Sequence, residues 1–256
     1  MKERIILVTN DDGINAKGFR TLLEIIKDYG RVIAISTDVS KSGMSHSLTL
    51  RTPLRMKVHN DSEKFTLLYL NGTPVDCVKF VLNKYLNTNP DLLLSGINHG
   101  SNSSISSIYS GTVAAAREGA INGIPSIAFS LLDFAENADF SFMEPYIRTI
   151  VETVIRNGLD SGVCLNVNAP VPTLEPIKGI QVCRQAKGVW IEEFEKRTDP
   201  NGSHYYWLTG HFENYEPDAE DTDEWSLKNN YISVVPLHFE TTATFSIPKL
   251  KQVFIQ

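Results

Sequence analysis

Short apolar runs and longer segments with helical periodicity alternate over the first 170 residues of the chain. The short runs are rich in Ile, Leu and Val, as expected of strands that are buried on both faces of a sheet. They occupy residues 4–9, 31–36, 65–70, 91–95, 125–130 and 163–168. Between several of them, apolar residues recur at helical spacing, which predicts amphipathic helices. Strands that alternate with helices predict βαβ units, so we expect an α/β fold with a mainly parallel sheet.

The predicted helix boundaries carry residues that favour helix ends. The first helix ends at Gly30, a typical residue just beyond a helix C-terminus. Another begins with Thr73 as N-cap, Pro74 at the first helical position and Asp76 placed for a capping box. This structural role explains Thr73 and Asp76 sufficiently, so we assign them no catalytic role. Pro145 begins a later helix.

The pattern changes after Pro170. Strand-like segments joined by polar turns occupy residues 179–185, 203–210 and 231–242. No helical periodicity is evident between about 175 and 235. We therefore predict two parts, an α/β core over residues 1–170 and a β-rich extension over residues 171–256, whose lack of an obvious core of its own suits oligomerisation.

Two features of this extension have alternative interpretations. The acidic stretch 213–225 lacks the Asp-x-Asp-x-Asp-Gly pattern of a calcium loop, so a solvated loop is the favoured interpretation. Tyr205, Tyr206 and Trp207 would lie on a hairpin, where they suit a subunit interface or the protein core.

Composition and charge exclude several classes of protein. The chain has 256 residues, a net charge of −6 and three cysteines. The acidic balance argues against a protein that coats nucleic acid, and we expect no stable nucleic-acid complex. Three widely separated cysteines without a CxxC pair argue against a disulfide framework or a zinc knuckle. No apolar run approaches a membrane span, and the first residues lack a cleavage-like segment, so we expect a cytoplasmic protein without a membrane partner.

Polar residues with candidate chemistry follow two of the predicted strands. Asp11 and Asp12 come directly after the strand at 4–9, and Asn98 follows the strand at 91–95. Carboxyl ends of parallel strands share one edge of a sheet, where ligands bind. The residues Asn-Asp-Asp-Gly are also typical of a tight turn. Taken alone, the motif fits a purely structural turn as well as it fits a metal site. Two adjacent carboxylates with no basic neighbour in sequence favour a hard metal ion, which would neutralise them.

Hydroxyl-rich segments supply further candidates. Ser110, Gly111 and Thr112 begin a helix of small residues, where backbone N–H groups can bind an anion. Plain N-capping is an equally good interpretation of Ser110 and Thr112. Residues 37–53 are rich in Ser and Thr and could supply metal or phosphate ligands, although composition alone favours a solvated loop.

Familiar catalytic motifs are absent. The segment after the first strand has neither the GxGxxG of a dinucleotide site nor the Lys-Ser/Thr of a P-loop, and no GxSxG elbow occurs. The carboxylates are adjacent, unlike the alternating DxD of haloacid-dehalogenase phosphatases. Three histidines deserve mention, His46 and His99 near the candidate site and His238 near the C-terminus. Each is more often a structural hydrogen-bonding residue than a catalyst.

Several motifs occur in the order found in one known family. They are VTNDDGINAKG, SGMSHSLTL, NGTPVDCVK, LLLSGINHGSN, YSGTVAAAREGA and PLHFETT, and they span residue 5 to about 242. In this combination the chain resembles the SurE family of survival proteins. The resemblance implies a metal-dependent 5′-nucleotidase with a Rossmann-like, three-layer core. It also implies a C-terminal extension exchanged between the subunits of a homodimer or homotetramer.

The resemblance also implies roles for particular residues. One divalent ion per subunit, Mg²⁺ or Mn²⁺, would be held by the matching positions Asp11, Asp12, Ser42 and Asn98. Phosphate would be bound by Asn102, Ser110, Gly111 and Thr112. The family's metal loop begins Ala-Pro-Asp, whereas this chain has Ser36-Thr37-Asp38.

Two functions follow from these residues. The first is hydrolysis of nucleoside 5′-monophosphates, and also of 3′-monophosphates and short polyphosphate, with Asp11 and Asp12 as catalytic residues and Asp11 as the first choice of general base. The second is a catalytically silent regulator that binds nucleotides in the same pocket, suggested by the altered loop entry and the lack of an unmistakable base. The first is favoured because all four ligand positions carry competent oxygen donors.

Overall fold

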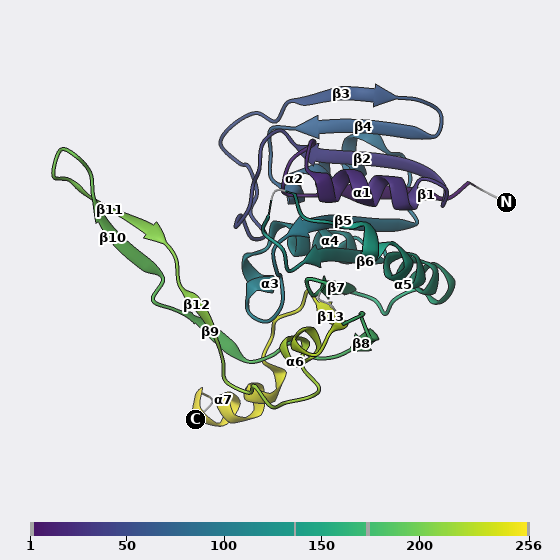
Figure 1. Cartoon of the computed structure of the whole chain (residues 1–256). Coiled ribbons are helices and arrows are strands. Elements are labelled where there is room, and N and C mark those ends of the chain that lie inside the picture. Colours follow the sequence, from purple (N-terminus) through teal and green to yellow (C-terminus); the bar gives the residue numbers. More distant parts are fainter. Residues whose placement is uncertain (1–2, 136, 173–174, 255–256) are drawn as a thin grey trace.

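A single large sheet organises the computed structural model, which describes residues 3–135, 137–172 and 175–254. Within these ranges the sheet has nine strands in the order β3-β4-β2-β1-β5-β6-β7-β13-β8 (Figure 1). Their bounds are Ile5–Thr9 (β1), Arg31–Thr37 (β2), Met56–Asp61 (β3), Phe65–Leu70 (β4), Leu92–His99 (β5), Ser126–Leu131 (β6), Val163–Ala169 (β7), Gly179–Val182 (β8) and Tyr231–His238 (β13). Strands β4, β2, β1, β5, β6 and β7 are parallel, while β3 and β13 are antiparallel to their neighbours β4 and β7. The prediction of a mainly parallel sheet is confirmed.

Helices cover both faces of the sheet and give the three-layer core. The residues of β1 alternate between the faces: Ile6 and Val8 pack with α1 and α5, whereas Leu7 packs with α2 and α4. These helices span Lys17–Ile26 (α1), Pro74–Phe80 (α2), Gly111–Ile121 (α4) and Glu144–Asn157 (α5). Shorter helical elements span Val81–Tyr85 (η1), Ser106–Tyr109 (α3), Ser141–Met143 (η2) and Thr244–Ser246 (η3).

The start of α2 has the predicted capping box. The hydroxyl of Thr73 accepts a hydrogen bond from the N–H of Asp76 at 3.1 Å, and the Asp76 carboxylate accepts one from the N–H of Thr73 at 2.9 Å. The same carboxylate also accepts the N–H of Thr49 at 3.2 Å. Asp76 is therefore structural, as predicted, and it additionally helps to fix the loop that follows β2.

The sheet continues beyond the six strands that the sequence predicts as its core. Strand β13 pairs with β7, and β8 pairs with β13, so residues 163–168 are not the last strand of the core. The edge strand β3 was not predicted. All but its first residue are exposed, and polar residues interrupt the run of apolar residues that marks a buried strand. The division at residue 170 remains a prediction, although β8 and β13 place part of the C-terminal region in the central sheet.

The C-terminal region has two helices, and the first of them contradicts the prediction of no helix between about 175 and 235. Helix α6 (Asp223–Lys228) begins inside the acidic stretch, and α7 spans Ile247–Phe254. The hydroxyl of Thr222 caps α6 by accepting the N–H of Trp225 at 3.3 Å. Asp223 is completely buried. The solvated-loop interpretation is therefore wrong for the end of this stretch, because its acidic residues there begin a buried helix.

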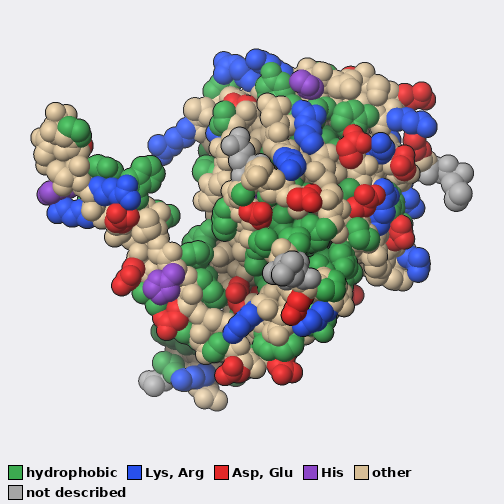
Figure 2. All heavy atoms as spheres, in the orientation of Figure 1, with side chains coloured by type: hydrophobic (Ala, Val, Ile, Leu, Met, Phe, Trp, Pro, Cys, Tyr) green, Lys and Arg blue, Asp and Glu red, His purple; other side chains and the backbone are tan. Residues whose placement is uncertain are grey.

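A long hairpin arm stands clear of the body of the molecule (Figures 1 and 2). Its base consists of β9 (Gly188–Ile191) paired with β12 (His211–Asn214), and its outer part consists of β10 (Phe194–Thr198) paired with β11 (His204–Leu208). On the outer part, Tyr206 and Trp207 are more than half exposed, and Tyr205 is 41% exposed. These side chains do not face the core, so the core interpretation is wrong, and the interface interpretation remains a prediction.

Within the described ranges, no helix has the length and apolarity needed to cross a membrane.

Candidate active site

The turn after β1 places one carboxylate inside the protein and another at its edge. Asn10 fixes this turn, because its amide donates to the carbonyl of Gly13 at 2.9 Å and accepts the hydroxyl of Ser36 at 2.6 Å. Gly13 has a φ of 96°, a conformation that glycine adopts readily. Asp11 is only 2% exposed, whereas Asp12 is partly exposed. The turn chemistry seen in the sequence is thus real, and it positions the two carboxylates.

Residues of strand β5 and helix α4 lie next to the side chain of Asp11. The hydroxyl of Thr112 donates to Oδ1 of Asp11 and lies 3.3 Å from Oδ1 of Asn98. A Cβ atom on Gly111 would lie 2.9 Å from Oδ2 of Asp11, so this close approach of α4 requires glycine. The structure therefore brings together Asp11, Asn98, Gly111 and Thr112, which the sequence placed in separate segments.

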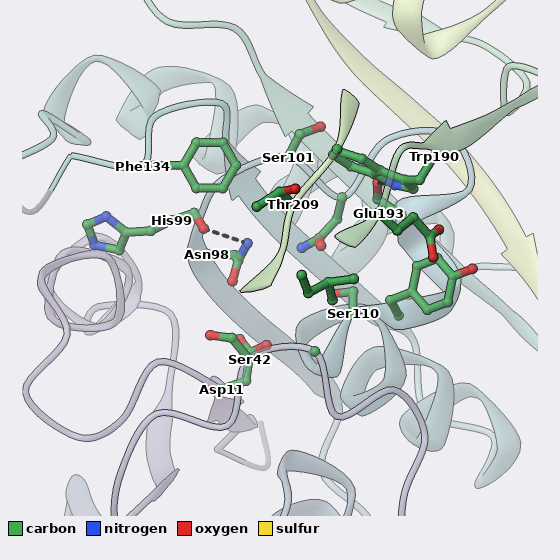
Figure 3. Close-up of a pocket in the computed structure, with 16 residues that line it drawn as sticks. Asp11, Ser42, Asn98, His99, Ser101, Ser110, Phe134, Trp190, Glu193 and Thr209 are labelled. Carbon is green, nitrogen blue, oxygen red and sulfur yellow. Dashed lines mark hydrogen bonds between the residues drawn. The ribbon is translucent and has the colours of Figure 1, made fainter. Parts of the chain in front are cut away.

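Asn98 is oriented by hydrogen bonds to the backbone. Its amide nitrogen donates to the carbonyls of His99 at 3.1 Å and Gly100 at 2.9 Å. Its oxygen consequently points to the side of the cavity where Asp11 and Ser42 lie (Figure 3). The backbone N–H of His99 donates to Asp12 at 3.2 Å.

The rings of the candidate histidines make structural contacts. The ring of His99 turns away from Asn98 and packs edge-on against Phe140, with centroids 4.8 Å apart (Figure 3). His46 pairs with the buried Glu118 at 3.0 Å. His238 stacks on Phe239 at the end of β13. Each therefore has a structural role, as the sequence favoured.

The electrostatic environment of Asp11 and Asp12 favours the binding of a cation. Burial, and secondly the charge of Asp12, raise the pKa of Asp11 to about 7, against hydrogen bonds that lower it. Burial also raises the pKa of Asp12. Among the described residues, the ion pairs include neither carboxylate. A bound metal ion would supply the missing positive charge.

The donor set fits a hard divalent ion. Two carboxylates, the Asn98 amide oxygen and the Ser42 hydroxyl are the oxygen ligands that Mg²⁺ and Mn²⁺ prefer. Over the part of the chain that the structure describes, no three His, Cys, Asp or Glu side chains form a metal-binding group.

Ser42 lies on the loop after β2, which is fixed at several points despite its solvated composition. The N–H of Lys41 donates to the carbonyl of Asp11 at 2.7 Å. Three residues after Ser42, the N–H of Ser45 donates to the carbonyl of Tyr109 at 2.9 Å. Ser42 itself is exposed, and its hydroxyl lies 3.1 Å from that of Ser40.

One cavity of about 500 Å³ contains most of the predicted site residues. We call it the central cavity. Its polar lining includes Asp11, Ser42, Asn98, Asn102 and Ser110. Ser110 also caps α4 by accepting the N–H of Val113 at 3.0 Å, so its capping interpretation is confirmed. The N–H groups of Gly111 and Thr112, which precede Val113 in α4, have no partner within the helix.

Comparison with known proteins agrees with this arrangement. The family model described as "Survival protein SurE" matches residues 6–192. The chain belongs to the SurE family. It is 50% identical over 251 residues to a protein of Flavobacterium psychrophilum named 5′-nucleotidase SurE, covering 98% of this chain and 97% of the relative. A protein of Christiangramia forsetii with the same name is 51% identical over 251 residues, covering 97% and 96%.

A solved structure extends this likeness to the fold. The crystal structure of the SurE protein from Aquifex aeolicus is 40% identical and matches with a TM-score of 0.83, covering 97% of this chain and 99% of that one. The α/β fold predicted from the sequence is confirmed by this match as well as by the sheet itself.

The central cavity of this SurE-family chain also has walls that the sequence did not reveal. Phe134 and Tyr109 come from the core, and Trp190, Glu193 and Thr209 come from the hairpin arm (Figure 3). Trp190 is 36% exposed, and its indole N–H lies 3.3 Å from the hydroxyl of Ser106. No motif marks Trp190, Glu193 and Thr209, because only the course of the arm brings them to the end of the sheet.

Proposed function

We propose that this chain is a metal-dependent phosphatase that hydrolyses nucleoside 5′-monophosphates to nucleoside and phosphate. It also accepts nucleoside 3′-monophosphates and short polyphosphate. The observation that carries this proposal is the adjacent carboxylates of the buried Asp11 and the partly exposed Asp12 near the start of α4, with Asp11 lining a cavity that also has aromatic walls. The relatives named 5′-nucleotidase SurE support it over nearly the whole length of the chain.

In this proposal Asp11, Asp12, Asn98 and Ser42 hold one Mg²⁺ or Mn²⁺ ion. When bound, the ion acts as a Lewis acid toward the phosphoryl group and makes a bound water more acidic. The protein holds the donors in place before the ion arrives, because Asn98 is fixed by backbone carbonyls and Asp11 by Thr112.

The start of α4 binds the phosphate. The first N–H groups of this helix, at Gly111 and Thr112, are free of intrahelical partners and carry the positive end of the helix dipole. With the hydroxyl of Ser110 and the amide of Asn102, they stabilise the negative charge on the phosphoryl oxygens during in-line transfer.

Asp11 is the general base in this proposal. Its Oδ1 accepts the hydroxyl of Thr112, which leaves Oδ2 to orient the attacking water and to take its proton.

The aromatic walls of the central cavity suit the nucleoside. Replacing Trp190 by Ala is expected to raise KM for nucleoside monophosphates about tenfold, because stacking of a base on an aromatic ring contributes about 1–3 kcal/mol. Steady-state kinetics with nucleotides and with p-nitrophenyl phosphate, which has no nucleoside, measures the effect. The matched control is Trp207→Ala, also on the arm but outside the cavity lining. Equal KM changes in both variants, or equal changes for both substrates, would contradict this role.

Phosphate release tests the proposed function. Full-length protein is incubated with the four common nucleoside 5′-monophosphates and the matching 3′-monophosphates in Mn²⁺, in Mg²⁺ and in EDTA. The proposal expects release that requires the metal and is lost in EDTA. Tight nucleotide binding without release under any divalent metal would instead support a silent nucleotide-binding regulator.

We further propose that the protein is a cytoplasmic homodimer or homotetramer that forms no stable nucleic-acid complex. The exposed aromatic residues on the outer arm, among them Tyr206 and Trp207, support assembly through this arm. The net charge of −6 disfavours nucleic acid. Light scattering from the purified protein measures the assembly, and a monomeric mass at micromolar concentration would exclude it.

A further inference from the structure

A buried carboxylate in the C-terminal region joins two segments that line the central cavity. Asp223 is completely buried and accepts three backbone N–H groups. Its Oδ2 accepts from Ser104 at 2.7 Å, and its Oδ1 accepts from Ala186 at 2.8 Å and from Glu224 at 2.9 Å. The proposed chemistry does not use this residue.

The first of these segments, residues 101–106, supplies polar lining of the cavity. Ser101, Asn102 and Ser106 all line it. Ser104 has a φ of 49°, which is uncommon for a residue other than glycine and persists only where surrounding contacts hold it. Two contacts hold Ser104: its N–H donates to Asp223, and its hydroxyl donates to the carbonyl of Ala186 at 2.9 Å.

The next residue of α6 strengthens the same connection. Glu224 accepts the hydroxyl of Ser103 at 2.5 Å, and that hydroxyl lies 2.6 Å from the hydroxyl of Ser101. The first turn of α6 therefore contacts two consecutive residues immediately after Asn102. Asn102 itself is held by β6 and β7: its N–H donates to Asn168 at 2.8 Å, its amide nitrogen donates to Ser130 at 2.8 Å, and its carbonyl accepts from Asn166 at 2.8 Å.

The second segment leads from Ala186 into β9 and the arm. Trp190, four residues later, forms the aromatic wall of the cavity. The same carboxylate binds the N–H groups of Ser104 and Ala186. It therefore links the segment that carries Asn102, proposed to bind phosphate, to the segment that carries Trp190, proposed to bind the nucleoside. Loss of this acceptor would be costly, since it would leave backbone N–H groups of both segments without a partner in the interior.

We infer that Asp223 is a positioning residue that places Asn102 and Trp190 for binding of the phosphate and the nucleoside of one substrate. This inference rests on the proposed function and assigns a role to the acidic stretch that the sequence predicts as a loop. Asp223 touches no substrate, and it acts through the backbone of the two segments.

The hydrogen-bond pattern makes Asp223→Asn a selective variant. An asparagine can keep Oδ1 as an oxygen and retain the N–H groups of Ala186 and Glu224. Its amide NH₂ would then face the N–H of Ser104, where two donors oppose each other. The expected damage is therefore confined to the segment that carries Asn102. Asp221→Asn is the matched control, because Asp221 is exposed and its carboxylate pairs with Arg184 on the surface.

Kinetics and hydrogen exchange on full-length protein test the inference. In Asp223→Asn, KM for a nucleoside monophosphate and the inhibition constant of inorganic phosphate are expected to rise about tenfold. The affinity of the metal site for Mn²⁺ should change less than twofold, and Asp221→Asn should match the wild type in all three. Deuterium exchange in peptides that span residues 99–109 should accelerate in Asp223→Asn only.

The outcomes separate this inference from the proposed function. A general loss of folded protein would lower kcat and leave KM unchanged, which would overturn the positioning role. Unchanged exchange at residues 99–109 would also overturn it.

If the wild type releases no phosphate, the proposed function fails, while phosphate binding by calorimetry and the exchange data still decide the inference. If Asp223→Asn does not fold, Ser104→Ala removes the second contact to Ala186, and the same readouts should shift in the same direction.

Discussion

Asp11→Asn is expected to lower kcat/KM for nucleoside 5′-monophosphates about 10³-fold while the protein stays folded. Asparagine keeps the size of the side chain but removes both the negative charge that a metal ion requires and the basic oxygen that accepts a proton. Loss of a general base alone costs about 10²- to 10⁴-fold. Steady-state phosphate release in saturating Mn²⁺ measures the effect, with circular dichroism to verify the fold.

The control for Asp11→Asn is Asp28→Asn, since Asp28 is exposed just beyond α1. It makes the same change of charge and should keep wild-type activity. Activity of Asp11→Asn within a few-fold of the wild type would contradict both the metal-binding and the general-base role of Asp11.

Without metal, the stability of the protein should fall as the pH rises from about 4 to 7. Burial and the neighbouring Asp12 raise the pKa of Asp11 from 3.8 to about 7. Between these values the folded state retains a proton that the unfolded state has lost, so unfolding becomes easier with increasing pH. The whole effect is on the order of 4 kcal/mol, because one pKa unit corresponds to about 1.4 kcal/mol.

Denaturant unfolding in EDTA at several pH values measures this dependence. Other buried acids contribute too, since burial also raises the pKa of Asp223 and Glu224. The difference between the wild type and Asp11→Asn isolates Asp11: the variant should be the more stable protein at pH 8, with the two converging near pH 4. Wild-type protein that is as stable as Asp11→Asn at pH 8 in EDTA would contradict an uncompensated buried carboxylate.

The sequence predicted the central sheet where burial controls the pattern of residues. Strands such as β1 and β5 are apolar because helices cover both of their faces, and this appears directly in the chain. Strand β3 lies at an edge and is mostly exposed, so its residues carry no such signal. Strand β13 was recognised as strand-like, but its pairing with β7 depends on the course of the C-terminal region.

The structure brings predicted site residues together where local sequence and topology agree. Asp11 and Asn98 each follow a buried strand, and parallel strands bring such residues to one edge. Trp190 and Asp223 could not be found in this way. Trp190 reaches the cavity through the path of a long arm, and Asp223 stands in an acidic stretch whose composition is typical of a solvated loop. The Asp223 carboxylate can be buried only because the N–H groups of Ser104 and Ala186 donate to it in the folded structure.

The central claim is that Asp11, Asp12 and Asn98 hold a divalent ion beside a phosphate site at the start of α4. Crystals grown with Mn²⁺ and a nucleoside 5′-monophosphate, measured for anomalous scattering of manganese, test it most directly. The account predicts an anomalous peak at coordination distance from these three side chains, with the phosphate density between the peak and the N–H groups of Gly111 and Thr112. A manganese peak at other residues, or nucleotide density away from α4, would contradict it.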